Sequence, residues 1–203
     1  MNVTEALLST WFGHWSDDEP MPDGGPPQYR IWWMKSDETD AMLRAKFADA
    51  NAAAKRGELD HWCDTPGGTL ALVLLLDQIS RNIHRNTADM FAGDAAARTV
   101  VHRAIRLGLD QQMAPIHRYF LYMPLMHSEG LADHELATER FETLAAETSS
   151  LERSSCYRGA ADYEQKHRAI VERFGRYPHR NTLLGRESTP EEEAFLTEAG
   201  SSF

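Results

Sequence analysis

The stretch GGTLALVLLLDQISRN, residues 67–82, is apolar on nearly every side up to Asp77, and polar residues follow at helical spacing. Asp77 and Arg81 are four positions apart, as are Gln78 and Asn82, so each pair lies along one stripe of a helix. A strand would also accommodate the short Leu/Val run, but the spacing of the polar group favours a helix. We therefore expect a central, buried helix here.

Helix-start and helix-stop residues divide the rest of the chain into further helices. We expect Asp37 to cap a helix that runs to about Arg56 and stops at Gly57. Gly175 is expected to stop the longest helix, and Thr189–Glu192 reads as a capping box with proline in the first helical position. The other expected helices span residues 94–108, 115–124 (with Pro124 ending or kinking the helix), 131–147 and 152–174.

No segment alternates between apolar and polar residues over a strand's length, so the fold class is all-α. Successive helices with short turns suggest one helical domain, residues 1–203, in which antiparallel helix pairs form a tetratricopeptide-like α-α superhelix. A 34-residue repeat is not legible, so periodicity adds little to that expectation. The Pro/Gly-rich residues 20–27 are expected to form a loop.

Composition narrows the class of protein. The chain has 203 residues, 26% charged and 42% hydrophobic, which is typical of soluble proteins. The longest apolar run, residues 70–76, is much shorter than a bilayer span, and the N-terminus lacks a secretory signal. Cys63 and Cys156 form no CxxC pair, so we expect reduced thiols and a cytoplasmic location. A net charge of −10 argues against general binding to nucleic acid or to anionic membranes.

The charge is unevenly distributed. Residues 153–186 contain eight Lys/Arg and three Asp/Glu, a local charge of +5, which leaves −15 on the remaining chain. Within this stretch, FGRYPHRNTLLGR (174–186) gathers Arg176, His179, Arg180 and Arg186 around a proline. A cationic island in an acidic protein suits a small anion better than a long polyanion, which the remaining surface would repel.

Three polar clusters interrupt the apolar helices, and they supply the candidate ligand-binding residues. The first is DQISRN, the second is HSE after Pro124, and the third is the cationic stretch together with the helix before it. An internal salt-bridge network that locks helices together explains the first cluster as well as a ligand site does. The candidates are Asp77, Arg81, His127, Glu129, His167, Arg176, His179 and Arg180.

The segments GELDHWCDTPGGTLALVLLLDQISRNIHRNT, RYFLYMPLMHSE and HRAIVERFGRYPHRNTLLGRESTPEEEAFL together closely resemble the bacterial family catalogued as domain of unknown function 924. The resemblance covers residues 7–203. It implies an all-α, tetratricopeptide-like fold and no established activity. Residues 20–27 look longer than is usual in the family.

Three hypotheses for function follow from these residues. The leading one is a concave pocket that binds a small phosphorylated or carboxylated anion through Arg81, Arg176 and Arg180, with Asp77 orienting an arginine and His127 or His179 as a titratable donor. Acid–base or phosphoryl chemistry is conceivable there, and the enzyme question stays open. The alternative is a peptide- or protein-binding module that uses the groove of a helical solenoid. The third is a metal site among His127, Glu129, His167 and His179, but their spacing matches no metal motif, so we expect no metal or cofactor.

Overall fold

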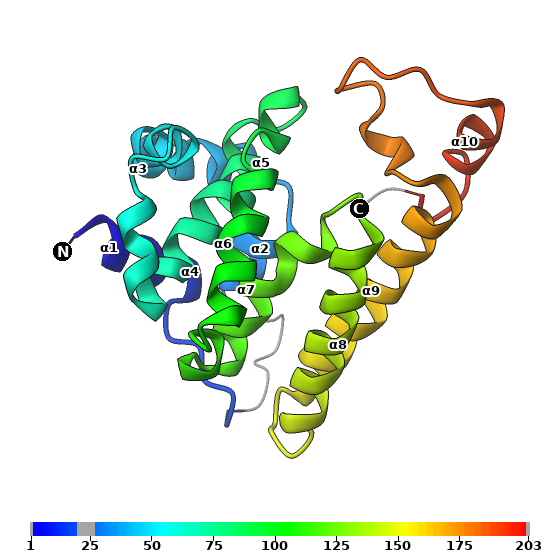
Figure 1. The fold of residues 1–203 in the computed structure, drawn as a ribbon. Helices are drawn as coiled ribbons and strands as arrows, with labels where there is room; N and C mark the ends of the chain where they lie inside the picture. Colours follow the sequence, from blue (N-terminus) through cyan, green and yellow to red (C-terminus); the bar gives the residue numbers. More distant parts are fainter. Residues whose placement is uncertain (1, 20–26, 202–203) are drawn as a thin grey trace.

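The computed structural model describes residues 2–19 and 27–201, and this part of the chain is helical without a β-strand. Figure 1 shows the helices packed in chain order, with the C-terminal segment turning back toward the middle of the molecule. The helices are α1 (Val3–Phe12), α2 (Gln28–Trp33), α3 (Asp37–Lys55), α4 (Pro66–Leu74), α5 (Ser80–Ile83), α6 (Asp94–Arg106), α7 (Pro115–Met126), α8 (Leu131–Glu147), α9 (Ser154–Phe174) and α10 (Pro190–Phe195). The all-α expectation is confirmed, and residues 20–26 of the expected loop lie outside the described residues.

The central helix is the scaffold of the fold. Thr65 accepts a hydrogen bond from the amide of Gly68 and so caps α4, with Pro66 in the first turn. Every residue from 68 to 80 is buried, as expected from the apolar run. Elements α3, α6 and α7 pack around this segment. The helix therefore presents its polar C-terminal end to several neighbours at once.

A wide, π-helical turn, Leu75–Ile79, joins α4 to α5. In such a turn the hydrogen bonds span five residues, and one extra residue is inserted into the helix. Two carbonyls of the turn, which accept from the amide of Ser80, also accept from side chains: Asn51 donates to the carbonyl of Leu75 at 2.8 Å, and Arg81 donates to that of Asp77 at 3.1 Å. This turn was not expected from the sequence.

Several helix boundaries differ from the sequence expectations. Ser36, and not Asp37, caps α3, because the Ser36 hydroxyl accepts from the amide of Thr39. Helix α7 continues two residues beyond Pro124, so this proline does not end it. Helix α2 was not expected. The bounds of α8 agree with the expected 131–147, Gly175 ends α9 in the left-handed conformation, and Thr189 forms the expected capping box.

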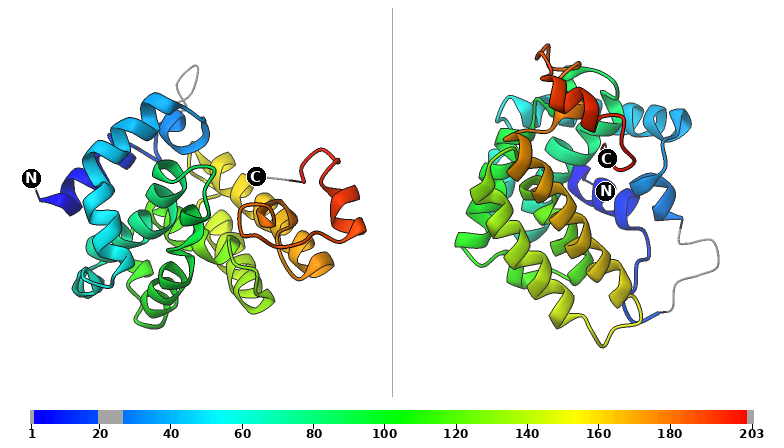
Figure 2. Two further views of the ribbon diagram at one scale, coloured as in Figure 1. Left: turned by 90° about the horizontal axis from the view of Figure 1, so that it is seen from above. Right: turned by 90° about the vertical axis from the view of Figure 1, so that its right-hand side faces the viewer.

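The hydrophobic core has two parts. The larger one joins α1 to α9 and includes aromatic contacts between α1, α2 and α7, where the Trp32 indole donates to the carbonyl of Trp11. The smaller one contains Ile170, Val171, Tyr177 and Phe195. Helices α8 and α9 lie side by side along their length, with α7 against α8 (Figures 1 and 2). The segment after α9 packs back over the end of α7 and the start of α6, because Tyr177 donates to the carbonyl of Met126 and Arg180 contacts Asp94.

Two general properties of the described residues bear on function. Across residues 2–19 and 27–201, no helix combines the length and the apolar character that crossing a bilayer demands. Cys63 and Cys156 are both free thiols, and burial raises the pKa of Cys156 to about 11. A thiol with such a pKa is inert at neutral pH.

Candidate functional site

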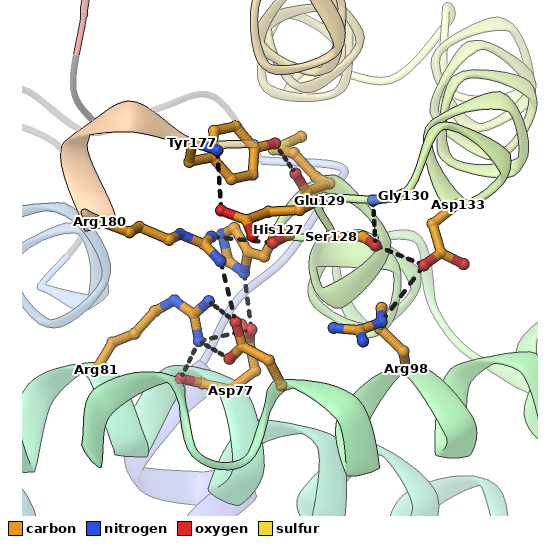
Figure 3. Close-up of polar contacts among 12 residues, drawn as sticks. Asp77, Arg81, Arg98, His127, Ser128, Glu129, Gly130, Asp133, Tyr177 and Arg180 are labelled. Atoms are coloured by element: carbon orange, nitrogen blue, oxygen red, sulfur yellow. Dashed lines mark hydrogen bonds and ion pairs between the residues drawn. The ribbon is translucent and has the colours of Figure 1, made fainter. Parts of the chain in front are cut away.

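Five charged or titratable side chains meet where the central helix, α6, α7 and the C-terminal segment come together; we call them the Arg180 cluster. They are Asp77, Arg81, Asp94, His127 and Arg180, and Figure 3 shows Asp77 and Arg81 facing His127 and Arg180. Asp94 opens α6, His127 follows α7, and Arg180 ends the short 3-10 helix Pro178–Arg180. Four of these five were candidates from the sequence, and they come from three segments far apart in the chain.

Asp77 is fully buried and has three side-chain partners. Its carboxylate pairs with Arg81 at 2.9 Å, meets Nδ1 of His127 at 2.7 Å and accepts from the Gln78 amide at 2.5 Å. Burial alone would favour the neutral acid, but the charge of Arg81 and the contact with His127 outweigh it and hold the pKa of Asp77 well below its usual range. Asp77 is therefore ionised at neutral pH.

Asp94 is shared by two arginines. Arg81 binds it with both terminal nitrogens, at 2.9 and 3.1 Å, whereas Arg180 reaches it with one nitrogen at 3.3 Å. The α6 N-terminus comes this close to the central helix because Gly93 has no side chain: a Cβ there would lie 2.3 Å from the carbonyl oxygen of Leu76. The glycine thus places Asp94 within reach of Arg81.

Arg180 is 7% exposed, yet its hydrogen bonding is incomplete. Its guanidinium lies between the rings of Phe91 and Tyr177, 4.7 and 4.5 Å from their centroids, and Nη2 donates to the carbonyl of His127 at 2.9 Å. Among the described residues, its buried Nε has no hydrogen-bond partner. Burial and the neighbouring charge of Arg81 lower the pKa of Arg180. Arg180 is thus a buried cation with unfilled donor capacity.

Three histidines lie beside Arg180 or its neighbour Tyr177, and they are neutral at pH 7. Burial lowers the pKa of His127 below its usual range, and lowers those of His167 and His179 to about 3 and about 4. The rings of His127 and His167 are 6.3 Å apart, and Tyr177 lies 5.8 Å from His167 and 5.5 Å from His179. Nδ1 of His167 donates to the carbonyl of Tyr163.

Glu129 lies beside the cluster and has its own partners. It binds Arg186 with both carboxylate oxygens, at 2.7 and 2.9 Å, and accepts from the amide of Tyr177 at 2.9 Å. Burial opposes ionisation, but Arg186 lowers the pKa of Glu129. Glu129 therefore helps to hold Tyr177, and through it Arg180.

Arg176 lies apart from the cluster. It forms a two-point ion pair with Glu192, at 2.6 and 2.8 Å, and donates to the carbonyl of Glu187. This pair lowers the pKa of Glu192 to about 2. Arg176 thus fastens α10 to the preceding loop, and the expected convergence of Arg176 with Arg81 and Arg180 is not seen.

Residues 153–186 carry less unpaired positive charge in the folded protein than their sequence implies, because acids pair with several of their arginines and most of these acids come from other segments. Arg168 pairs with Glu172, Arg173 with Glu191, Arg176 with Glu192 and Arg186 with Glu129. Arg180 differs from these four because its acid is already held by a second arginine.

Sequence reasoning missed Asp94, Phe91 and Tyr177 as members of the site. Asp94 resembled an ordinary acid in the first turn of a helix, where acids are favoured by the helix dipole. Tyr177 stands inside the cationic motif, between Arg176 and Pro178, and this position was the available signal. Among the described residues, no three His, Cys, Asp or Glu side chains gather as a metal site.

The fold and the cluster define an all-α protein with a buried ion-pair network at the junction of its C-terminal segment and central helix. Comparison with known proteins identifies the family. The chain belongs to the family described as "Bacterial protein of unknown function (DUF924)", whose model matches residues 7–200. The resemblance noted from the sequence motifs is thus confirmed.

A solved structure of similar fold agrees with this assignment. The chain is 38% identical to a protein of unknown function, ATU0120 from Agrobacterium tumefaciens, with a TM-score of 0.78 over 97% of this chain and 99% of that chain. No curated protein matches the sequence. These relatives carry no assigned activity, and the geometry of the Arg180 cluster is the remaining guide to function.

Proposed function

We propose that the protein binds a small, singly charged oxyanion, a carboxylate above all, at Arg180. One observation carries the proposal: the guanidinium of Arg180 is buried between Phe91 and Tyr177, and its Nε lacks a partner among the described residues. A buried charged donor left unsatisfied is costly, about 1–3 kcal/mol or more. An oxygen from a ligand would remove that cost, and an arginine edge matches a carboxylate well.

The charge of the cluster favours a carboxylate over a phosphate. Arg81 and Arg180 balance Asp77 and Asp94, and His127 is neutral because burial lowers its pKa. A phosphate dianion would bring two negative charges next to two buried carboxylates. A carboxylate brings one negative charge. It would bind at Arg180, whose contact with Asp94 is longer than that of Arg81, and so it meets less repulsion.

The two aromatic rings support the same ligand geometry. The rings of Phe91 and Tyr177, 4.7 and 4.5 Å from the guanidinium carbon, restrict the position of Arg180 before a ligand arrives. Side-chain entropy that is lost on folding is not lost again on binding. A planar anion is therefore favoured over a tetrahedral one.

A thermal-shift and calorimetric titration tests this proposal. Wild type would be titrated with acetate, longer mono- and dicarboxylates, phosphate and phosphorylated metabolites. At 100 times its Kd, a ligand adds about 2.7 kcal/mol. For a chain of this size that raises Tm by roughly 5–10 °C. We expect carboxylates to shift Tm and phosphate to shift it less.

Matched variants locate the binding. Arg180→Met should abolish the shift, and Arg180→Lys should weaken it, because lysine keeps the charge but loses the planar fork. Arg168→Met removes another arginine from the same stretch, in an exposed pair with Glu172, and should bind as wild type does. Unchanged binding in Arg180→Met, or no response to any carboxylate, would refute the proposal.

We also propose that the helices form the tetratricopeptide-like superhelix expected from the sequence. The packing of α7 on α8 and of α8 on α9, in chain order, supports it. The alternative function, a peptide-binding module, is favoured by one observation: a hollow beside α9 is lined by Tyr163, Ile170 and Phe195. Binding to a peptide array that survives Arg180→Met but fails in Tyr163→Ala would select this alternative.

A further inference from the structure

His127 is held by a buried carboxylate on one side of its ring. Nδ1 of the imidazole lies 2.7 Å from Oδ1 of Asp77, while Nε2 forms no hydrogen bond with any residue that the structure describes. The His127 side chain is 13% exposed, and Asp77 is completely buried. The ring is therefore fixed at Nδ1, and its Nε2 has no hydrogen-bond partner among the described residues.

This contact decides which nitrogen carries the proton. Asp77 is ionised, because Arg81 lowers its pKa, and a carboxylate can only accept. Nδ1 of His127 must then be the donor, and in the neutral ring the lone pair lies on Nε2. Burial lowers the pKa of His127, so the ring is neutral at pH 7 and ready to take a proton. A histidine arranged in this way is suited to general-base catalysis.

The same residue is linked to the proposed anion site. Nη2 of Arg180 donates to the main-chain carbonyl of His127, so the guanidinium is bonded directly to the residue that carries the imidazole. Figure 3 shows both side chains on the same side of Asp77. A base and an oxyanion-binding donor held together are the two parts that acyl transfer to water requires.

We propose that His127 is the general base of an ester hydrolase, in which Nε2 activates water against a carboxylic ester whose carbonyl oxygen faces Arg180. This inference rests on the proposed function, because the carboxylate bound at Arg180 is then the product acid. Asp77 is a positioning residue, since it acts only through His127. The net-neutral cluster accepts a neutral ester and stabilises the single negative charge that develops in the reaction.

The step balances with water as the second reactant. Nε2 of His127 takes a proton from water as the water oxygen bonds to the carbonyl carbon. The carbonyl electron pair moves onto its oxygen, which the N–H groups of Arg180 stabilise. When this intermediate collapses, the ester C–O bond breaks and the departing alkoxide takes the proton from His127. An alcohol leaves and His127 is neutral again. The product acid then releases its remaining proton to solvent, and its carboxylate stays on Arg180.

The tautomer of His127 is the first test, and it needs no substrate. Long-range nitrogen–proton NMR spectra of ¹⁵N-histidine-labelled protein at pH 7 should show His127 neutral, with its proton on Nδ1. In Asp77→Asn, the signal should change to the Nε2–H form or to a mixture of the two forms. A proton on Nε2 of His127 in the wild type, or a doubly protonated ring, would overturn the proposal.

Turnover of p-nitrophenyl acetate is the second test. We expect hydrolysis to fall at least about 100-fold in His127→Gln, the range usual for loss of a general base. Asp77→Asn should lower kcat more than it raises KM. His102→Ala is the matched control: His102 also contacts an aspartate, Asp133 at 2.6 Å, but its side chain is 45% exposed. This variant measures the background from surface histidines and should hydrolyse as wild type does.

The results separate this inference from the proposed function. Wild-type rates in His127→Gln, with circular dichroism confirming the fold, would overturn the hydrolase while leaving carboxylate binding intact. Hydrolysis that depends on His127 but shows no inhibition by acetate, in wild type or Arg180→Met, would instead refute binding at Arg180. Hydrolysis lost in His127→Gln and inhibited by acetate through Arg180 would support both.

Discussion

Replacing Arg180 and replacing its acid, Asp94, should change stability by very different amounts. Asp94→Asn removes the carboxylate that Arg81 and Arg180 share, and leaves two guanidinium groups without it at the buried cluster. Arg180→Met removes a buried cation but leaves Asp94 with both nitrogens of Arg81. The structure therefore predicts that the acid is needed for stability and that the second arginine is not.

The magnitudes follow from the contacts. Arg180→Met loses a charged hydrogen bond to the His127 carbonyl, about 1.5–3 kcal/mol, and the ring stacking, about 2 kcal/mol. It also removes the desolvation cost of a buried ion, several kcal/mol, so the net change should stay within about 1.5 kcal/mol. Asp94→Asn breaks a buried network by removing one partner and should cost about 3–5 kcal/mol.

Thermal and urea unfolding of the ligand-free proteins measure both changes. At roughly 2–4 °C per kcal/mol for a chain of this length, Asp94→Asn should lower Tm by roughly 6–20 °C, and Arg180→Met should change it by roughly 6 °C at most, in either direction. A loss of more than about 3 kcal/mol in Arg180→Met would refute the reasoning. Arg180 would then be a structural residue that holds helices together, and its unpaired Nε would not support ligand binding.

Three further predictions concern the same region. The pKa of Asp77 is lower in the folded protein than its ordinary value of 3.8, so the ionised carboxylate stabilises the fold above that value, and this stabilisation is lost as pH falls toward the folded pKa. The free energy of unfolding in urea, measured from pH 7 to pH 2, should therefore depend less on pH in Asp77→Asn than in wild type. Gly93→Ala should destabilise the protein by about 1–3 kcal/mol, because the added Cβ would meet the carbonyl of Leu76. Gly159→Ala places a Cβ where no atom lies nearby and should stabilise the protein by up to about 1 kcal/mol. Calorimetry of the two variants measures the difference. Elemental analysis of untagged protein should find no stoichiometric metal, and one equivalent of zinc or iron would contradict this.

The sequence predicted the helices that have strong local signals. Neighbouring residues determine these features, and so the sequence was enough to predict them. They are the apolar run at 67–82, the helix at 131–147, the helix stop at Gly175 and the capping box at Thr189. Helix α2 lacked such signals: it has six residues and no side-chain cap, and it is stabilised by Trp32 packing on α1 and α7. Contacts made across the fold, and not local propensity, place this segment.

The members of the site were more predictable than their pairing. Asp77, Arg81, His127 and Arg180 were candidates because charges at the ends of apolar helices need partners. Which acid pairs with which arginine depends on tertiary packing. Arg176 and Arg180 stand four residues apart in one motif, yet one pairs with Glu192 of α10 and the other with Asp94 of α6. Nothing in the spacing distinguishes them.

The wide turn at Leu75–Ile79 also determines the direction in which the later side chains of the central helix point around its axis. Each residue of an α-helix advances the side-chain direction by about 100°. Removing one residue from the turn would restore a regular helix and rotate Arg81, Asn82 and Ile83 together away from their present partners. An alignment gap at this point in a related chain would therefore mark a protein with a different constellation at the junction, even where every motif residue is retained.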